Sequence, residues 1–413
     1  MLLEKSTSPL HDSARPTRLS AQVPRALAGL APTFLPAHRS RRRLLQRFSH
    51  GKQIPWRNHA FPLLALLLFV AATSVNWTPN DEELKWLQAP AVNGHGTTLT
   101  AVLDAPIRDD KNLLWCATMQ MAWDRAGLGI GTPILLEPSA KLADALNRQS
   151  FDPRWLDAKA TFITGGRVNA GVMKEIDSGA RALSNKGSKL LKHLEPGLGN
   201  DDLVFFAMLH KQLSFEQPFG RLGKFPLGGH QVPCFGFTPD QNDTEALHQQ
   251  VKVHSYHSKD DFVIELLTQD NAEQLVLARV PSPLTTLQKA SAGVVGQLQA
   301  APPAALGHDL LMVPQIVADE IARFSELEGR RVKSHPDLIL RQALQSISFQ
   351  MDEAGVKLSS EAAISFGCSA APAHVEPRLL ILKPPFLLLM KRRDAPQPYF
   401  VAWLGNADLL RAK

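Results

Sequence analysis

The chain has 413 residues, of which 44% are apolar and 20% are charged, an ordinary globular balance. Its net charge of +6 comes from the first 60 residues, which hold 11 Lys and Arg against two acids, whereas the remainder holds 34 basic and 37 acidic residues. The body of the chain therefore lacks the basic excess that attracts phosphates, so we expect no nucleic-acid partner.

The cysteine pattern excludes the common structural zinc sites. Cys116, Cys234 and Cys368 lie more than 100 residues apart, so no pair has the spacing of zinc ligands. Cys116 and Cys234 sit in apolar runs, which favours small buried thiols. We expect no metal and no cofactor.

Residues 1–57 are rich in Pro, Ser, Arg and Ala and show no sustained hydrophobic period. Such a segment buries too little apolar surface to offset the entropy of ordering, so it is predicted to be a disordered, basic, cytoplasmic leader.

Residues 58–77 contain an apolar run from Phe61 through Leu68 to Val75 that carries no charged residue. Its strongly apolar part is about 15 residues, shorter than the roughly 20 of a comfortable membrane span. Two interpretations stay open, a cleaved signal peptide and a transmembrane signal anchor. In both, the basic flank stays inside and residues 78–413 lie outside, secreted or held by a single-pass anchor.

Hydrophobic periodicity predicts helices first and strands afterwards. The predicted helices cover 112–126, 139–147 with Ser139 as N-cap, 170–175, 180–183, 186–193 and 284–299. The predicted strands cover 97–104, 203–213, 250–257, 262–267, 274–280, 310–314, 345–351, 378–382, 386–391 and 399–404. This order is typical of an α+β fold with a large, mostly antiparallel central sheet.

No catalytic set stands out. The glycines of 127–131 lack the Lys-Ser/Thr of a phosphate loop and are predicted to lie in an ordinary loop. His254 and His257 lie three apart in a strand, so they point to opposite faces and are expected to be solvent-exposed. A nucleophile at Cys368, served by His374, is the one enzymatic alternative; otherwise we expect no enzyme.

Residues 356–377 form a long run of mostly small or polar residues inside an otherwise compact sheet domain. Connections of this length tend to be functional or disordered. The run follows a predicted strand and Glu353-Ala-Gly355, and it precedes Pro385-Phe386 and the terminal block Phe400–Asn406. Upstream, the strand-length apolar run that begins at Leu203 is followed by Phe215-Glu-Gln-Pro-Phe219.

In these blocks and their order, residues 97–410 resemble a serpin, the protease-inhibitor fold that inserts a loop into its own sheet. The resemblance implies an exposed reactive-centre-type loop after Gly355, whose hinge includes Glu353, Gly355, Val356 and Leu358. Counting on from Gly355 places the bait bond near Cys368, Ser369 and Ala370. Their small side chains suggest an elastase-like, extracytoplasmic serine protease as the partner of a monomer.

The hinge departs from the pattern that the resemblance implies, which is Thr followed by a run of Ala. Val356, Lys357, Leu358 and Glu361 occupy those positions. Leu358 is bulkier than Ala, and crowding a packed sheet by that much costs about 1–3 kcal/mol. Two functions stay open: an inhibitor of serine-type endopeptidases, and a non-inhibitory serpin-like binding or scaffold domain tethered to the membrane.

Overall fold

The structure, a computed structural model, describes residues 96–194, 198–239, 241, 244–281, 285–300, 302–307, 309–356 and 377–411. All of them belong to one compact unit, 72–413. The predicted leader 1–57, the apolar segment 58–77, Leu358 and the bait residues 368–370 lie outside the described residues. Among the described helices, none has the length and apolar character that a membrane crossing requires.

The helices are short and peripheral. They are α2 (Thr118–Ile130), α3 (Lys141–Arg148), α4 (Val172–Ser184), α5 (Glu245–Gln249) and α6 (Leu287–Ala300), with single 3-10 turns at Pro153–Trp155, Ala158–Ala160 and Leu190–Lys192.

The prediction of one helix over 112–126 is wrong in its first part. Asn112–Cys116 forms a strand, β2, in which every residue is buried, and the helix begins at Thr118. A short, fully buried apolar run has no period that separates strand from helix, so the pairing partners decide. Gly127 and Gly129 do not lie in a loop, because α2 continues through Ile130; Gly131 follows the end of the helix.

Two further helix predictions need correction. Ser139 is not an N-cap, because α3 begins at Lys141 after Ala140 and no side chain caps it. The pieces predicted over 170–175 and 180–183 form one helix, α4. Gly179 interrupts the apolar pattern there because any side chain at this position would collide with the Phe162 ring.

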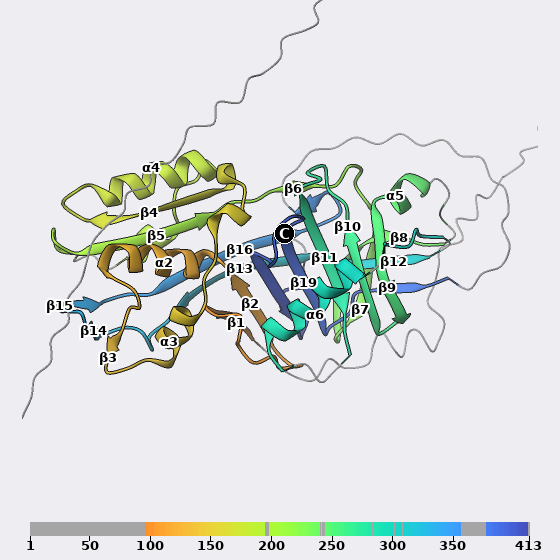
Figure 1. The fold of residues 1–413 in the computed structure, drawn as a ribbon. Helices are drawn as coiled ribbons and strands as arrows, with labels where there is room; N and C mark the ends of the chain where they lie inside the picture. The colour runs from red at the N-terminus through yellow and green to blue at the C-terminus, as the bar shows by residue number, and fades with distance from the viewer. Residues whose placement is uncertain are drawn as a thin grey trace, which may run out of the picture. The chain divides into compact units, whose positions relative to one another are not determined.

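A seven-stranded sheet dominates the fold (Figure 1), with strand order β1-β2-β20-β19-β11-β10-β9. Neighbouring strands are antiparallel except for β1 and β2, which are parallel. The strands are β1 (Thr97–Thr100), β2 (Asn112–Cys116), β9 (Val251–Ser258), β10 (Asp261–Leu266), β11 (Glu273–Arg279), β19 (Phe386–Arg392) and β20 (Phe400–Leu404). This sheet confirms the predicted α+β class and its large, mostly antiparallel sheet.

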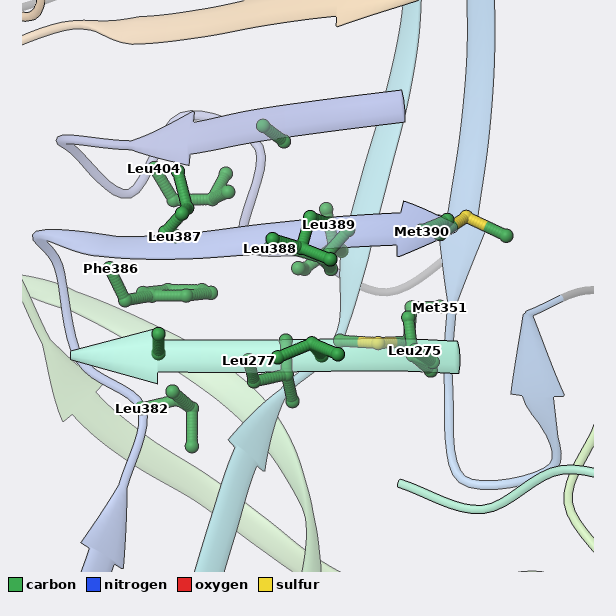
Figure 2. Packing of buried hydrophobic residues seen from close by; sticks show 14 of the residues in the cluster. Leu275, Leu277, Met351, Leu382, Phe386, Leu387, Leu388, Leu389, Met390 and Leu404 are labelled. Atoms are coloured by element: carbon green, nitrogen blue, oxygen red, sulfur yellow. The ribbon is translucent and has the colours of Figure 1, made fainter. Parts of the chain in front are cut away.

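The core lies on this sheet. On β19, Phe386, Leu387, Leu388 and Leu389 are each 0% exposed. Figure 2 shows them beside Leu277 of the neighbouring strand β11. Burial on both faces explains the unbroken apolar run at 386–390, because each side of the strand meets other side chains.

The remaining strands form smaller sheets. One has the order β18-β12-β8-β7 and another the order β15-β14-β3; the other pairs are β4–β5, β13–β16 and β6–β17. Their bounds are β3 (Leu136–Glu137), β4 (Thr161–Arg167), β5 (Leu203–Leu209), β6 (Leu213–Ser214), β7 (Gly220–Leu227), β8 (His230–Phe237), β12 (Leu310–Pro314), β13 (Ile316–Arg323), β14 (Arg330–Val332), β15 (His335–Leu340), β16 (Leu344–Met351), β17 (Gly355–Val356) and β18 (Leu379–Ile381).

Candidate functional site: the hinge and the strands beside it

The predicted hinge is a two-residue strand. β17 pairs antiparallel with β6, Gly355 opposite Ser214 and Val356 opposite Leu213. Val356 is 4% exposed and Leu213 1% exposed, so the ladder is anchored in the core. Of the predicted hinge residues, the structure thus brings Gly355 and Val356 onto the chain segment that follows β5.

Gly355 is required by geometry at this position. Its φ is +133°, a conformation that residues with a side chain rarely adopt. A Cβ there would overlap the carbonyl oxygen of Leu213. The glycine therefore permits both the turn after β16 and the close approach of β17 to β6.

Glu353, the remaining predicted hinge residue among the described ones, is held from two sides. Its carboxylate pairs with the guanidinium of Arg221 on β7 and accepts a 2.8 Å hydrogen bond from Gln315 Nε2, just before β13. Its backbone oxygen accepts a 2.9 Å bond from the Phe219 N–H. Arg221 and Gln315 could not be found from the sequence, because nothing local marks partners so far from residue 353.

The strands beside the hinge form two separate pairs, β4–β5 and β13–β16. Helix α2 packs against β4, β5 and β16, so both pairs lie on the same helix (Figure 1). Among the described residues, the only ladder between the two pairs is the short β6–β17 junction at one end. Each pair therefore presents a strand edge that no described strand covers.

β5 is unusual for a strand with an uncovered edge. All seven of its residues are apolar, yet only Phe206 is buried and the other six are half-buried. Phe205 lies against Gly129 of α2, whereas Phe206 packs with Phe162 on the α4 side at a ring-centroid distance of 6.2 Å. An apolar, half-buried strand with an edge that no described strand covers is a template for pairing with another strand.

A buried ion cluster fixes the chain between β5 and β6. Lys211 Nζ lies 2.8 Å from Glu273 and 3.0 Å from Asp270, and its side chain is 10% exposed. The Tyr399 hydroxyl donates a 2.9 Å bond to the same Glu273. Burial lowers the pKa of Lys211, but the hydrogen bonds to Glu273 and Asp270 outweigh burial and raise it above its usual value. The cluster ties this segment to the seven-stranded sheet.

Other sequence candidates fall elsewhere. Cys116 and Cys234 are buried, as predicted, and burial raises the pKa of both thiols. His257 is 67% exposed, as predicted. The prediction that His254 is exposed is wrong, because its side chain is only 5% exposed and forms a hydrogen bond with Glu265. Within the described ranges, no group of three His, Cys, Asp or Glu is placed to hold a metal.

No protein-family model and no curated protein sequence matches the chain. Solved structures do. Serpin48 of the insect Tenebrio molitor is 12% identical, with 71% of this chain and 92% of that chain aligned and a TM-score of 0.42. A serpin of the trematode Schistosoma haematobium is 10% identical, over 72% and 94%, with a TM-score of 0.43. The thermophilic serpin Tengpin is 11% identical, over 72% and 89%, with a TM-score of 0.45.

The α+β fold with a large, mostly antiparallel sheet is the fold class that the sequence resemblance implied. The strands predicted before residue 352, after Pro385 and near residue 400 occur as β16, β19 and β20. A fold of this kind does not by itself define an activity. Whether the chain inhibits a protease depends on what the loop can do beside β5.

Proposed function

We propose that the protein is a serpin-like inhibitor of an extracytoplasmic serine protease, in which the chain after Gly355 serves as bait and inserts beside β5 after cleavage. The observation that supports this most directly is β5 itself. It is wholly apolar, mostly half-buried, and paired on one edge only among the described strands. A strand added there would bury its side chains and satisfy the backbone groups along that edge.

The register of the hinge supports the same mechanism. Continuing the antiparallel β6–β17 ladder would set Leu358 opposite Lys211, Ala362 opposite Ala207 and Ile364 opposite Phe205. Paired residues in an antiparallel ladder share a face, and Phe205 faces α2. The inward set of the loop would therefore be apolar or small, and the outward set would include Lys357 and Glu361, as in a half-buried strand.

The bait bond would lie near Cys368-Ser369-Ala370, where the small side chains fit the shallow primary pocket of an elastase-like protease. In this proposal the segment 58–77 exports or anchors the domain, so that the loop meets its protease outside the cytoplasm. The bulk of Leu358 slows insertion and does not forbid it, because its cost of about 1–3 kcal/mol is small beside a strand's worth of new burial.

The test is the formation of an SDS-stable complex with elastase-type and subtilisin-type proteases. A matched pair of loop variants separates insertion from mere cleavage. Ala362→Glu puts a charge on the inward face and is expected to convert the protein into a substrate, whereas Glu361→Ala alters the outward face and is expected to retain the complex.

A wild-type protein that is cleaved in the loop, forms no complex and gains no thermal stability contradicts the proposal. That result favours the non-inhibitory binding or scaffold function, in which deletion of the loop leaves partner binding intact. Replacement of Cys368 by Ser is expected to leave complex formation unchanged, and the absence of any loss of activity in this variant would remove the enzymatic alternative.

A further inference from the structure

The segment between α4 and β5 contacts both strand pairs beside the hinge. Residues 186–194 follow α4 and include the 3-10 turn Leu190–Lys192. Leu190 and Leu191 pack against the cluster that α4 forms with Phe206 of β5. The same turn contacts β16, which belongs to the other pair. Because this segment reaches from one pair to the other, we call residues 186–194 the strap.

The strap lies on the face of the strands that points away from α2. Phe205 of β5 lies against α2, whereas its neighbour Phe206 packs with α4 and the strap. On β13, Ala318 is buried, whereas Asp319 is exposed on the opposite face and pairs with Lys189 of the strap. The strap therefore spans the interval between β5 and β16 on this outer face.

The attachment of the strap to the β5 side is apolar. The outward residues of β5 belong to one cluster with the two strap leucines. The outward residues of β16 after Leu344 are polar instead, namely Ser346, Ser348 and Gln350. Apolar packing therefore fixes the strap to β5 and α4 more firmly than to β16.

The polar contacts between the strap and the second pair are exposed or long. The Lys189 ammonium pairs with the Asp319 carboxylate, and the two side chains are 52% and 56% exposed. Gln342 Nε2, just before β16, donates a 3.4 Å hydrogen bond to the His193 carbonyl oxygen. An exposed ion pair is screened by solvent and salt, and a hydrogen bond of this length is weak. The strap can therefore leave β13 and β16 while it stays attached to α4.

A strand that enters beside β5 meets the strap. Such a strand lies about 4.8 Å from each neighbour, so β5 and β16 then stand about 10 Å apart. In the proposed register its outward side chains, Lys357 and Glu361 among them, point to the face on which the strap lies. A strap that kept both attachments would occupy the space that these side chains need.

We propose that the strap limits the rate at which a strand enters beside β5, and that breaking the Lys189–Asp319 ion pair permits the entry. This inference rests on the proposed function, because the entering strand is the cut bait loop. The attachment that has to break is charged and exposed, so entry becomes faster as the ionic strength rises.

The experiment cuts the loop of the full chain once, between residues 366 and 372, and follows with time the appearance of the form with the raised melting temperature, at low and at high salt. Asp319→Asn should speed this conversion about two- to fivefold at low salt, the effect of one exposed ion pair, and should remove most of its salt dependence. Lys189→Asp combined with Asp319→Lys should restore the slow, salt-dependent rate. Asp177→Asn breaks a comparably exposed pair with Arg181 within α4 and should leave the rate unchanged.

Conversion of Asp319→Asn at the wild-type rate, with the usual rise in melting temperature, overturns the role of the strap and leaves loop insertion standing. A protein that gains no thermal stability after the cut contradicts the proposed function, and the role of the strap is refuted with it. Hydrogen exchange of the uncut protein is a second readout, because the His193 and Leu194 amides donate to the Leu190 carbonyl within the strap. These amides should exchange faster in Asp319→Asn than in the wild type and in Asp177→Asn, and equal exchange in all three proteins contradicts the inference.

Discussion

The seven-stranded sheet and the strands beside the hinge differ in how their strands are paired and how deeply their side chains are buried. In the large sheet each interior strand pairs on both sides, and strands such as β19 carry residues that are 0% exposed. Beside the hinge, β4–β5 and β13–β16 are separate pairs among the described strands, and six of the seven β5 residues are only half-buried. The first region supplies stability, whereas the second is where we propose that a further strand enters.

From this contrast we expect structural rearrangement in the strands beside the hinge and not in the seven-stranded sheet. Regions with few buried contacts and open backbone edges are those that rearrange, while closed sheets set the global stability. Substitutions in the two regions should therefore have unequal effects, and measuring those effects tests the difference between the regions.

The largest difference is expected from the same substitution made in both regions. Leu388→Ala, at a residue that is 0% exposed, should lower the free energy of unfolding by about 2–5 kcal/mol. Leu203→Ala, on half-buried β5, should lower it by about 1 kcal/mol, because less surface and no closed cavity are involved. Urea unfolding measures both, and equal losses would contradict the division of roles.

Lowering the pH should destabilise the large sheet by protonating Glu265. Its folded pKa of about 2 lies below the ordinary 4.5, so its stabilising effect is complete above the ordinary value and is lost as the pH falls toward 2. The shift corresponds to about 3 kcal/mol. Urea unfolding at about pH 6 and about pH 3 should show somewhat more than half of this loss in the wild type, because pH 3 lies between the two pKa values, and a smaller loss in Glu265→Gln. Glu245→Gln, at an exposed residue, serves as the control, and the same acid sensitivity in all three proteins would refute the assignment.

At the junction of the two regions, Gly355→Ala should cost about 1–3 kcal/mol, because Ala disfavours the positive φ and meets the Leu213 carbonyl. Hydrogen exchange should show that the Phe215 amide, which donates to the Ala354 carbonyl, becomes less protected. Gly166→Ala, where no atom lies within 4 Å of the added Cβ, is the matched control and should be close to neutral. Unchanged exchange in the Gly355 variant would mean that β17 does not depend on this glycine.

The smallest effects are expected at the side-chain ties of Glu353. Gln315→Ala removes a 2.8 Å bond to a mostly buried carboxylate and should cost about 1 kcal/mol. Arg221→Gln should cost less, because the Arg221 side chain is 79% exposed and solvent screens the pair. Urea unfolding ranks the two variants, and the reverse order would show that the surface ion pair dominates the hinge.

Much of the large sheet could be predicted from the sequence, and the reason is local. Phe262–Leu267, Gln274–Val280 and Phe386–Lys391 are apolar runs of strand length bounded by turns, and β10, β11 and β19 follow them closely. The sequence places Glu353 and Gly355 directly after a predicted strand, which β16 confirms, but it does not predict that Gly355 and Val356 pair with β6.

The features that the sequence does not predict depend on contacts between residues that are far apart in the chain. The sequence predicts a helix over Asn112–Cys116 because nothing in the run itself indicates that it pairs with β20. It predicts a solvent-exposed His254 because alternation places the residue on a face without indicating that α6 and Glu265 cover that face. β5 and β16 are more than 100 residues apart in the chain, so no local sequence pattern predicts that they do not pair with each other.

The most direct test is hydrogen exchange of the β5 amides, Leu203–Leu209, before and after a single proteolytic cut between residues 366 and 372. If the cut loop enters beside β5, the exchange of these amides slows markedly and the melting temperature rises, while the amides of β19 stay unchanged. If the β5 amides exchange as before and the melting temperature does not rise, the loop does not insert, and inhibition by insertion is ruled out.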